Sequence, residues 1–284
     1  NYTVTCQQSQ GTVLYPNGLN GWFNPYFANG YNDKLKWETT TSYNVGIDFG
    51  FLNNRIMGSI EGYFRKTTDL LSYVTVPAGS STVNMLNKNI GDLENYGVEF
   101  NLTARPIVTN DFTWILTYNV GYNHNKITKL NDNNATYETG DNIGKQGQKA
   151  MANKVGYAAN TFWLYQQVYD ENGAPIEGVY VDQNGDGQID NLDRVLNHQK
   201  DPKVTMTFGS QFRYKAWDLG FSLRASIGNY LYNNVESSNG YYDRMFQYGL
   251  HNLVEADYYF NSQQEVSDYY LRNASFLRCD NITL

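Results

Sequence analysis

The sequence contains no run of apolar residues long enough for a membrane-spanning helix, which needs about 20 of them. Stretches rich in Leu, Ala, Glu and Lys, typical of helical proteins, are also missing. Basic residues are too few for a face that binds nucleic acid, since 21 Lys and Arg stand against 28 Asp and Glu and the net charge is −7. These absences argue against a helical membrane protein and a nucleic-acid scaffold. They leave membrane strands open, because such strands are only half apolar.

Cysteine is scarce as well, with only Cys6 and Cys279. The two lie far apart and form no CxxC or zinc-binding pattern. We expect two unrelated thiols, and a disulfide between them is the alternative. The chain opens on NYTVTCQQSQ, without a Met and without the basic and apolar segments of a secretion signal. Any export signal is therefore expected upstream of this sequence or already removed.

Signatures of catalysis are few. His124, His198 and His251 have no metal-binding spacing, and the sequence has no GxSxG motif and no glycine pattern of a phosphate-binding loop. The carboxylates Glu94 and Glu99 are more typical of solvated or lumen-lining groups than of an acid–base pair. We therefore expect that the protein is not an enzyme.

Aromatic residues are abundant: they make up 15% of the chain, which has 25 Tyr and also 25 Gly. This composition favours an all-β protein. Apolar and polar residues alternate in seven runs, and a period of two places successive side chains on opposite faces of a strand. The predicted strands cover residues 43–51, 56–65, 95–104, 112–123, 204–214, 217–228 and, reaching the end of the sequence, 275–284.

The connections between these strands alternate in length. Short turns are predicted at 52–54, 107–111 and 215–216, and long connections at about 66–91, 124–203 and 229–275. This alternation is typical of an outer-membrane barrel, whose strands of about ten residues cross the hydrocarbon layer. Phe51, Trp114, Tyr122 and Trp217 lie near strand ends, as in the aromatic girdles of such barrels. The alternative is a soluble barrel or sandwich with its apolar face inward.

Six complete strands are too few for a closed membrane barrel, so we expect the chain to be part of a larger one. Strand parity places the segment TFWLYQQVY (161–169) within the long connection 124–203. As a spanning strand it would move the short turn at 215–216 to the outer side. Residues 1–34 are predicted to form an outer loop or an extension.

The segment DQNGDGQIDNLD (182–193) has oxygen-bearing side chains at the spacing of an EF-hand calcium loop, with Gly187 at the turn position. The predicted ligands are Asp182, Asn184, Asp186, Gln188 through its carbonyl, Asp190 and Asp193. Two features differ from a calcium sensor: the last position is Asp instead of Glu, and the preceding APIEGVYV (174–181) is expected to be extended rather than helical. We predict a structural Ca²⁺ site, with Mg²⁺ as the second choice. The alternative is an Asx-rich turn without an ion.

The third long connection, 229–275, is dense in Tyr, Asn and Asp. Aromatic rings beside amides and carboxylates suit sugar rings, whose CH faces stack and whose hydroxyls need polar partners. The alternative is that these Tyr pack a folded outer loop or belong to the interfacial girdle. The pattern therefore assigns no single residue to a substrate.

Four segments together resemble SusC/RagA-type TonB-dependent outer-membrane transporters of Bacteroidetes. They are LKWETTTSYNVGIDFGFLNNRIMGSIEGYFRKTTDLL (35–71), NIGDLENYGVEFNL (89–102), YVDQNGDGQIDNLDR (180–194) and SFLRCDNITL (275–284), in that order and spacing. The resemblance implies that residues 35–284 are the C-terminal part of a transmembrane antiparallel β-barrel of about 22 strands with long extracellular loops. The implied location is the cell outer membrane, and the aspartate-rich loop of the family falls on the six ligands named above.

The resemblance also implies partners and a transport role. The partners are a SusD-like surface lipoprotein assembled with the barrel, the TonB–ExbB–ExbD complex and outer-membrane lipid. The cargo is an oligosaccharide, with an oligopeptide as the alternative, and it is imported without bond chemistry. The plug and the TonB-contacting box of the family are not in this sequence. A different class remains as the alternative, a soluble or surface-attached, calcium-stabilised all-β module that binds glycans.

Overall fold

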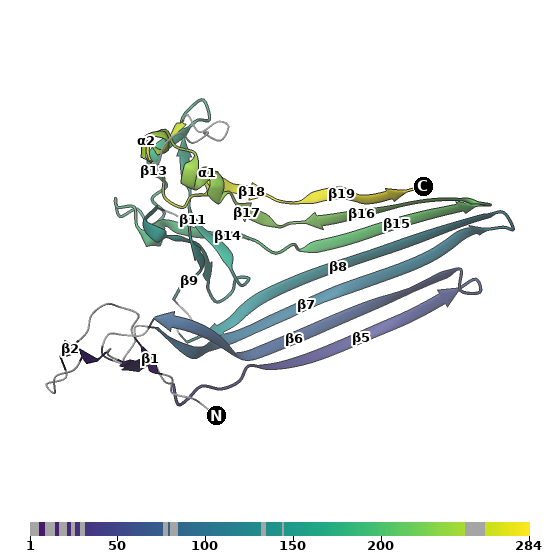
Figure 1. Ribbon diagram of the computed structural model, residues 1–284, viewed down its shortest axis with the longest axis horizontal. Coiled ribbons are helices and arrows are strands. Elements are labelled where there is room, and N and C mark those ends of the chain that lie inside the picture. The colour runs from purple at the N-terminus through teal and green to yellow at the C-terminus, as the bar shows by residue number, and fades with distance from the viewer. Residues whose placement is uncertain are drawn as a thin grey trace. The chain divides into compact units, whose positions relative to one another are not determined.

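The computed structural model of the protein describes residues 32–75, 79, 85–131, 135–143, 145–247 and 259–284, and the backbone of four short strands before residue 32 (Figure 1). These short strands pair as β1 (Cys6–Gln8) with β4 (Tyr26–Ala28) and β2 (Tyr15–Pro16) with β3 (Trp22–Phe23). The chain forms two compact units, one of residues 1–40 and 67–92 and the other of residues 41–66 and 93–284. The expected role of residues 1–34 stays a prediction.

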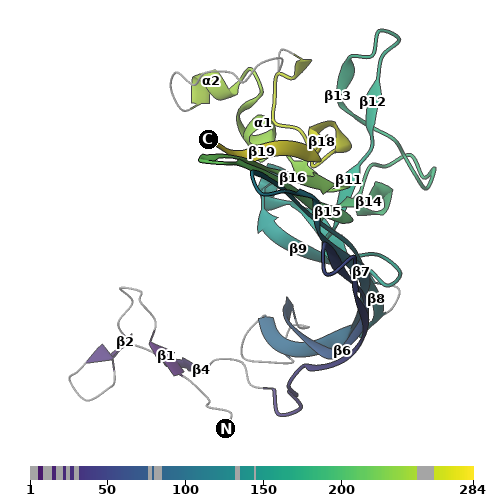
Figure 2. The same cartoon turned by 90° about the vertical axis from the view of Figure 1, so that its right-hand side faces the viewer.

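One long antiparallel sheet holds all seven predicted strands, in the order β19–β16–β15–β8–β7–β6–β5. The strands are β5 (Thr39–Phe51), β6 (Ile56–Thr75), β7 (Met85–Val108), β8 (Phe112–Leu130), β15 (Val204–Tyr214), β16 (Trp217–Ile227) and β19 (Phe276–Thr283). Figure 2 shows β8, β15, β16 and β19 as a curved sheet viewed along the strands.

Three strands run further than the alternation predicted. β6 continues to Thr75 and β7 begins at Met85, so much of the connection expected at 66–91 is strand. β8 continues to Leu130, beyond the expected start of the second long connection at 124. Backbone pairing persists there although the side chains no longer alternate, because the hydrogen-bonded ladder does not depend on which face is apolar.

The register of β8, β15 and β16 separates two faces. Val204 pairs with Tyr122 and with Ile227, while the next residue, Thr205, pairs with Gly121 and Ser226. Apolar side chains thus gather on one face and polar side chains on the other. The apolar face is largely uncovered, with exposed fractions of 66% at Trp217, 73% at Leu277 and 72% at Ile282. A long, uncovered apolar face of this kind suits lipid.

The long connections fold into smaller elements. A four-stranded sheet has the order β14–β11–β10–β9, and two hairpins pair β12 with β13 and β17 with β18. Their bounds are β9 (Tyr137–Asn142), β10 (Lys149–Asn153), β11 (Thr161–Tyr165), β12 (Gln167–Tyr169), β13 (Pro175–Tyr180), β14 (Arg194–Gln199), β17 (Tyr230–Tyr232) and β18 (Leu271–Asn273). Two short helices follow β17, α1 (Asn234–Asn239) and α2 (Arg244–Gln247). None of the helices in the described parts of the chain could span a membrane.

In Figure 1 the elements of the second and third connections lie at one end of β8, β15 and β16, and the turns at 109–111 and 215–216 lie at the other. The segment 161–169 forms β11 and β12, which belong to the smaller sheets rather than to the long one. Strands between long connections on one side and short turns on the other are typical of membrane barrels.

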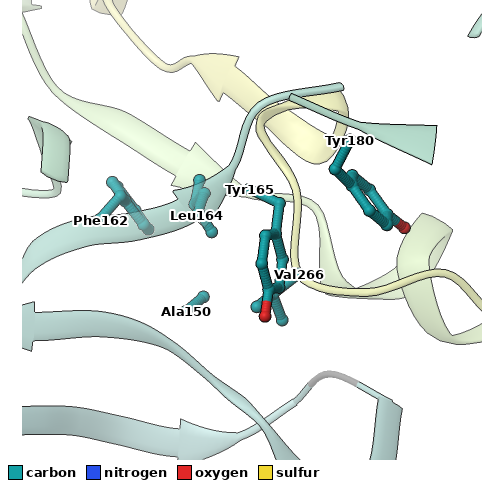
Figure 3. Packing of buried hydrophobic residues seen from close by; sticks show 6 residues of the cluster. All are labelled: Ala150, Phe162, Leu164, Tyr165, Tyr180 and Val266. Carbon is teal, nitrogen blue, oxygen red and sulfur yellow. The ribbon is translucent and has the colours of Figure 1, made fainter. Parts of the chain in front are cut away.

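The apolar core of the second and third connections is shared between them. Its buried members are Ala150, Phe162, Leu164, Tyr165, Tyr180 and Val266 (Figure 3). Val266 comes from the third connection and the other five from the second, and the backbone amide of Tyr165 donates a hydrogen bond of 2.9 Å to the carbonyl of Val266. The two connections therefore fold onto each other.

The first unit has a polar centre at Asn89. The Asn89 amide oxygen accepts a hydrogen bond from the Lys36 backbone at 2.9 Å. Its nitrogen donates to the carbonyls of Lys36 at 2.9 Å and Asp69 at 2.7 Å. One side chain thus joins the segment before β5 to β6.

Cys279 lies on β19 as an exposed free thiol, and the side chain of Cys6 lies outside the described residues. The prediction of two unrelated thiols is therefore untested.

Candidate functional site

The acidic loop, residues 182–193, connects β13 to β14 and turns tightly around its first aspartate. The Asp182 carboxylate accepts hydrogen bonds from the backbone amides of Gly185 at 2.6 Å and Gly187 at 2.8 Å. Both glycines have positive φ, +76° and +78°, a conformation that residues with a β-carbon rarely adopt. The glycines at these positions therefore permit the turn that the sequence predicted.

Asp193 closes the loop from its other end. Its carboxylate accepts hydrogen bonds from the backbone amides of Gln183 and Asp190, both at 2.8 Å, and the side chain is fully buried. The amide of Asp190, together with those of Gln183 and Asn184, holds the pKa of Asp193 below its ordinary value. The loop thus keeps a buried negative charge at the position where an EF-hand has its last ligand.

The middle of the loop consists of successive side-chain turns. The Asn184 amide oxygen accepts from the Asp186 backbone at 2.9 Å, and the Asp186 carboxylate accepts from the Gln188 backbone at 2.8 Å. Such turns satisfy the backbone amide two residues further along the chain with a side-chain oxygen. Asp190 caps a short 3₁₀ turn, Asn191–Asp193, that ends the loop.

The residue types and their order fit a hard cation, which prefers carboxylate, amide and carbonyl oxygens. The carboxylates of Asp182, Asp186, Asp190 and Asp193 take part in none of the ion pairs of the described chain. Their oxygens cap backbone amides, and within the described ranges no three Asp, Glu, His or Cys side chains converge on one metal position. The six predicted ligands thus share one loop, and the metal itself stays a prediction.

Arg194 anchors the loop to the smaller sheet, and the sequence reasoning did not single it out. Its guanidinium lies 3.8 Å from the centre of the Trp163 ring and donates to the Trp163 carbonyl at 2.7 and 3.1 Å. It also pairs with Glu138 at 3.0 Å and donates to the carbonyl of Lys149. The only sequence signal was an arginine directly after the acidic run.

Glu177, on β13, joins the second connection to the third. Its carboxylate accepts from the backbone amides of Asn261 at 3.1 Å and Ser262 at 2.9 Å, and from the Ser262 hydroxyl at 2.9 Å. The side-chain amides of Asn261 and Gln264 donate to it as well, at 3.0 and 3.3 Å. Burial acts to raise the pKa of Glu177, but the hydrogen bonds from Ser262 and Asn261 outweigh burial and lower it.

The polar face of the long sheet carries a shallow groove of about 460 Å³. Glu99 on β7 and Arg224 on β16 line it, with Asn119, Thr205 and Thr207 among the residues of the strands in between. Glu94 is not among the residues that line the groove, and its carboxylate pairs with Lys66 at 3.4 Å. Hydroxyls, amides and balanced charges make this face suitable for a wet passage.

Part of the tyrosine-rich third connection serves packing. Tyr241 and Tyr270 are buried with Phe260 in a second apolar cluster. For these two residues the structure supports the packing alternative. His251 lies outside the described residues. Within those residues, neither His124 nor His198 belongs to a cluster of His, Cys, Asp and Glu that could hold a metal ion.

Comparisons with known proteins agree on one family. The family model described as "TonB dependent receptor-like, beta-barrel" matches residues 7–173. The TonB-dependent receptor SusC of Bacteroides thetaiotaomicron is 48% identical over an alignment of 270 residues, and the match covers 89% of this chain and 26% of that protein. The TonB-dependent receptor P3 of Formosa agariphila is 33% identical over 219 residues, 71% of this chain and 22% of that protein.

Solved structures match the fold over nearly the whole chain. The RagAB peptide transporter aligns with a TM-score of 0.73 and 21% identity, over 99% of this chain and 32% of that one. The RagAB peptide importer in its closed-closed state gives a TM-score of 0.74 with the same identity and coverage. The chain thus spans between a fifth and a third of the length of these relatives.

Proposed function

Because the chain belongs to the TonB-dependent receptor-like β-barrel family, as a segment of the SusC/RagA type, we propose that the whole protein imports oligosaccharides across the outer membrane by a TonB-dependent route. The matches confirm the antiparallel barrel fold and the outer-membrane location expected from the sequence. They argue against the soluble or surface-attached alternative. The main structural support for this proposal is the long sheet, whose apolar face is largely uncovered and whose polar face is lined with hydroxyls and amides.

The choice of oligosaccharide over oligopeptide is supported by the polar groove. Asn119, Thr205 and Thr207 there offer neutral hydrogen-bonding groups that match sugar hydroxyls. An oligopeptide is the second candidate cargo, because the RagAB structures of the same fold are described as a peptide transporter and importer. The family is one of transporters, and we propose no bond chemistry for this chain.

We propose that a SusD-like lipoprotein covers the long connections and that the TonB–ExbB–ExbD complex supplies the energy. Support comes from apolar side chains exposed on those connections, at 71% for Leu192, 62% for Val235 and 70% for Phe246. Exposed apolar groups outside the lipid-facing strands are typical of protein interfaces.

We further propose that the acidic loop binds a structural Ca²⁺, with Mg²⁺ as the weaker candidate. The residues that would hold it are Asp182, Asn184, Asp186, Gln188, Asp190 and Asp193. Bound calcium would neutralise carboxylates that have no cationic partner within the described structure. Amide hydrogen bonds to Asp182 and Asp193 shape the loop between β13 and β14.

Uptake by cells tests the proposed import. Cells that carry or lack the gene for the full-length protein receive labelled oligosaccharides or oligopeptides, with and without a functional TonB. We expect uptake of oligosaccharides only when both the protein and TonB are present. Uptake of peptides alone would contradict the proposed cargo, and uptake without TonB would contradict the proposed mechanism.

A further inference from the structure

A second cavity, of about 590 Å³, lies apart from the acidic loop and from the polar groove. It is bounded by β8 at His124, by residues 156–158, by the end of β14 and by the start of β17. These segments are distant in sequence, and all belong to the second compact unit. The volume is in the range of small-molecule sites.

Aromatic side chains form part of the cavity wall. The rings of His198 and Tyr230 stack with their centres 3.8 Å apart and their planes at 14°. His198 has φ +58°, which is uncommon for a residue with a β-carbon, and such backbone conformations cluster at binding sites. Tyr157, with 42% of its surface exposed, adds a ring that the protein leaves partly uncovered.

The polar lining is rich in hydrogen-bond donors. Asn197 and Lys203 are both exposed and line the cavity, and no carboxylate belongs to that lining. The stem of Lys203 packs over Gly228, where an added β-carbon would lie 3.4 Å from Lys203 Cβ and Cγ. The Lys203 backbone is also fixed, since its amide donates to the Ile227 carbonyl at 3.0 Å. The backbone and the first side-chain carbons of Lys203 are therefore fixed at the edge of the cavity.

Burial, together with the nearby charge of Lys203, lowers the pKa of His198. At neutral pH the imidazole is therefore uncharged, and the lining combines Lys203 with neutral polar groups and rings. This combination does not favour a metal ion, and the Lys203 ammonium can donate hydrogen bonds to hydroxyl oxygens.

We propose that this cavity binds one sugar ring of an oligosaccharide, with Tyr157 as the stacking surface and Asn197 and Lys203 as donors to the hydroxyls. A pyranose presents an apolar CH face and polar edges, and aromatic rings beside amides match both. The proposal rests on the proposed import of oligosaccharides and deepens it by assigning a subsite at the base of the long connections.

Binding to the full-length transporter, purified in detergent, tests this subsite. The probes are neutral hexose oligosaccharides with α and β linkages, and the dissociation constant is measured by calorimetry. We expect Tyr157→Ala to weaken the binding of at least one of them by about tenfold or more, and Tyr157→Phe to bind as the wild type does. The matched control is Tyr169→Ala, because Tyr169 is 47% exposed and lies outside the cavity; it should bind normally.

Heat-dependent migration in gels checks that each variant keeps its barrel. Should Tyr157→Ala fail to fold, Lys203→Met gives the same test, because it keeps the stem over Gly228 and removes only the ammonium. Unchanged binding in the folded variant, equal loss in the control, or no oligosaccharide bound by the wild type would overturn the subsite. If cells still import oligosaccharides in those cases, the subsite fails and the proposed function stands, whereas wild-type uptake of peptides alone refutes both.

Discussion

At the scale of the residue, one serine lies among apolar side chains on the uncovered face of β15. Ser210 is 4% exposed, and its hydroxyl oxygen accepts a hydrogen bond of 2.9 Å from the indole nitrogen of Trp114 on β8. In hydrocarbon, an unpaired hydroxyl or indole N–H costs free energy, so the two groups satisfy each other. The alternation predicted the apolar neighbours of Ser210 but not its partner, which is 96 residues away.

Replacing Ser210 by Ala should leave the Trp114 N–H unpaired and destabilise the barrel by about 1–3 kcal/mol. The double variant Ser210→Ala with Trp114→Phe removes both polar groups and should cost less than the sum of the single changes. Unfolding of the full-length protein by urea in lipid vesicles measures both. Ser222→Ala, on the polar face, is the control and should have little effect. Strictly additive costs would show that the hydrogen bond does not matter.

The calcium proposal also depends on single side chains. Wild-type protein should melt at a lower temperature with a chelator than in calcium, since a ligand at about 100 times its dissociation constant stabilises by about 3 kcal/mol. Asp186→Ala should melt at the same temperature in both conditions. Asp170→Ala is the control, because Asp170 caps the amides of Asn172 and Ala174 in a similar turn outside the loop. A wild-type melting temperature that is the same in calcium and in chelator would refute the site.

At the scale of the element, strand positions follow from the sequence better than strand ends do. Every predicted strand of the long sheet is present, because alternation reports the two faces directly. The ends of β6 and β8 were missed because pairing continues through residues such as Lys66 and Thr67, where alternation stops.

In the candidate site, the spacing of oxygens located the acidic loop. Arg194 and Glu177 were missed because most of their partners are distant in sequence, up to 87 residues for Glu177.

The carboxylate of Glu177 is one of the groups that attach the hairpin of β12 and β13 to the third connection. The pKa of the Glu177 carboxyl is lowered from its ordinary value of 4.5 in the folded protein. The ionised carboxylate therefore contributes fully to stability above about pH 4.5, and this contribution is lost as the pH falls through the pKa of the folded protein. Hydrogen exchange of residues 259–264 should therefore accelerate below pH 4.5 in the wild type.

Glu177→Gln should show fast exchange of the same residues at every pH, since a neutral amide cannot accept from so many donors. Glu171→Gln, an exposed neighbour before β13, should behave as the wild type. If the hydrogen-exchange rate of residues 259–264 in the wild type, corrected for intrinsic exchange, did not rise below pH 4.5, the role of Glu177 would be contradicted.

At the scale of the whole molecule, the apolar face of the long sheet is largely uncovered in the described residues. The buried apolar clusters of the described chain instead include those formed by the long connections. This inside-out arrangement is stable only where lipid replaces water. The full-length protein should therefore require detergent for extraction and should migrate differently before and after heating in gels. Recovery in the aqueous fraction would contradict the membrane barrel.

The convergence of donors on Glu177 has a thermodynamic consequence for the two connections that it joins. If a ligand of the third connection changes the affinity of the second connection for its own ligand, the second ligand changes the affinity for the first by the same factor. Glu177 is one of the contacts through which the tyrosine-rich segment and the acidic loop, which follows β13, are linked, together with the shared apolar core. Replacing that carboxylate should therefore weaken the coupling between the two connections while the shared apolar core stays in place.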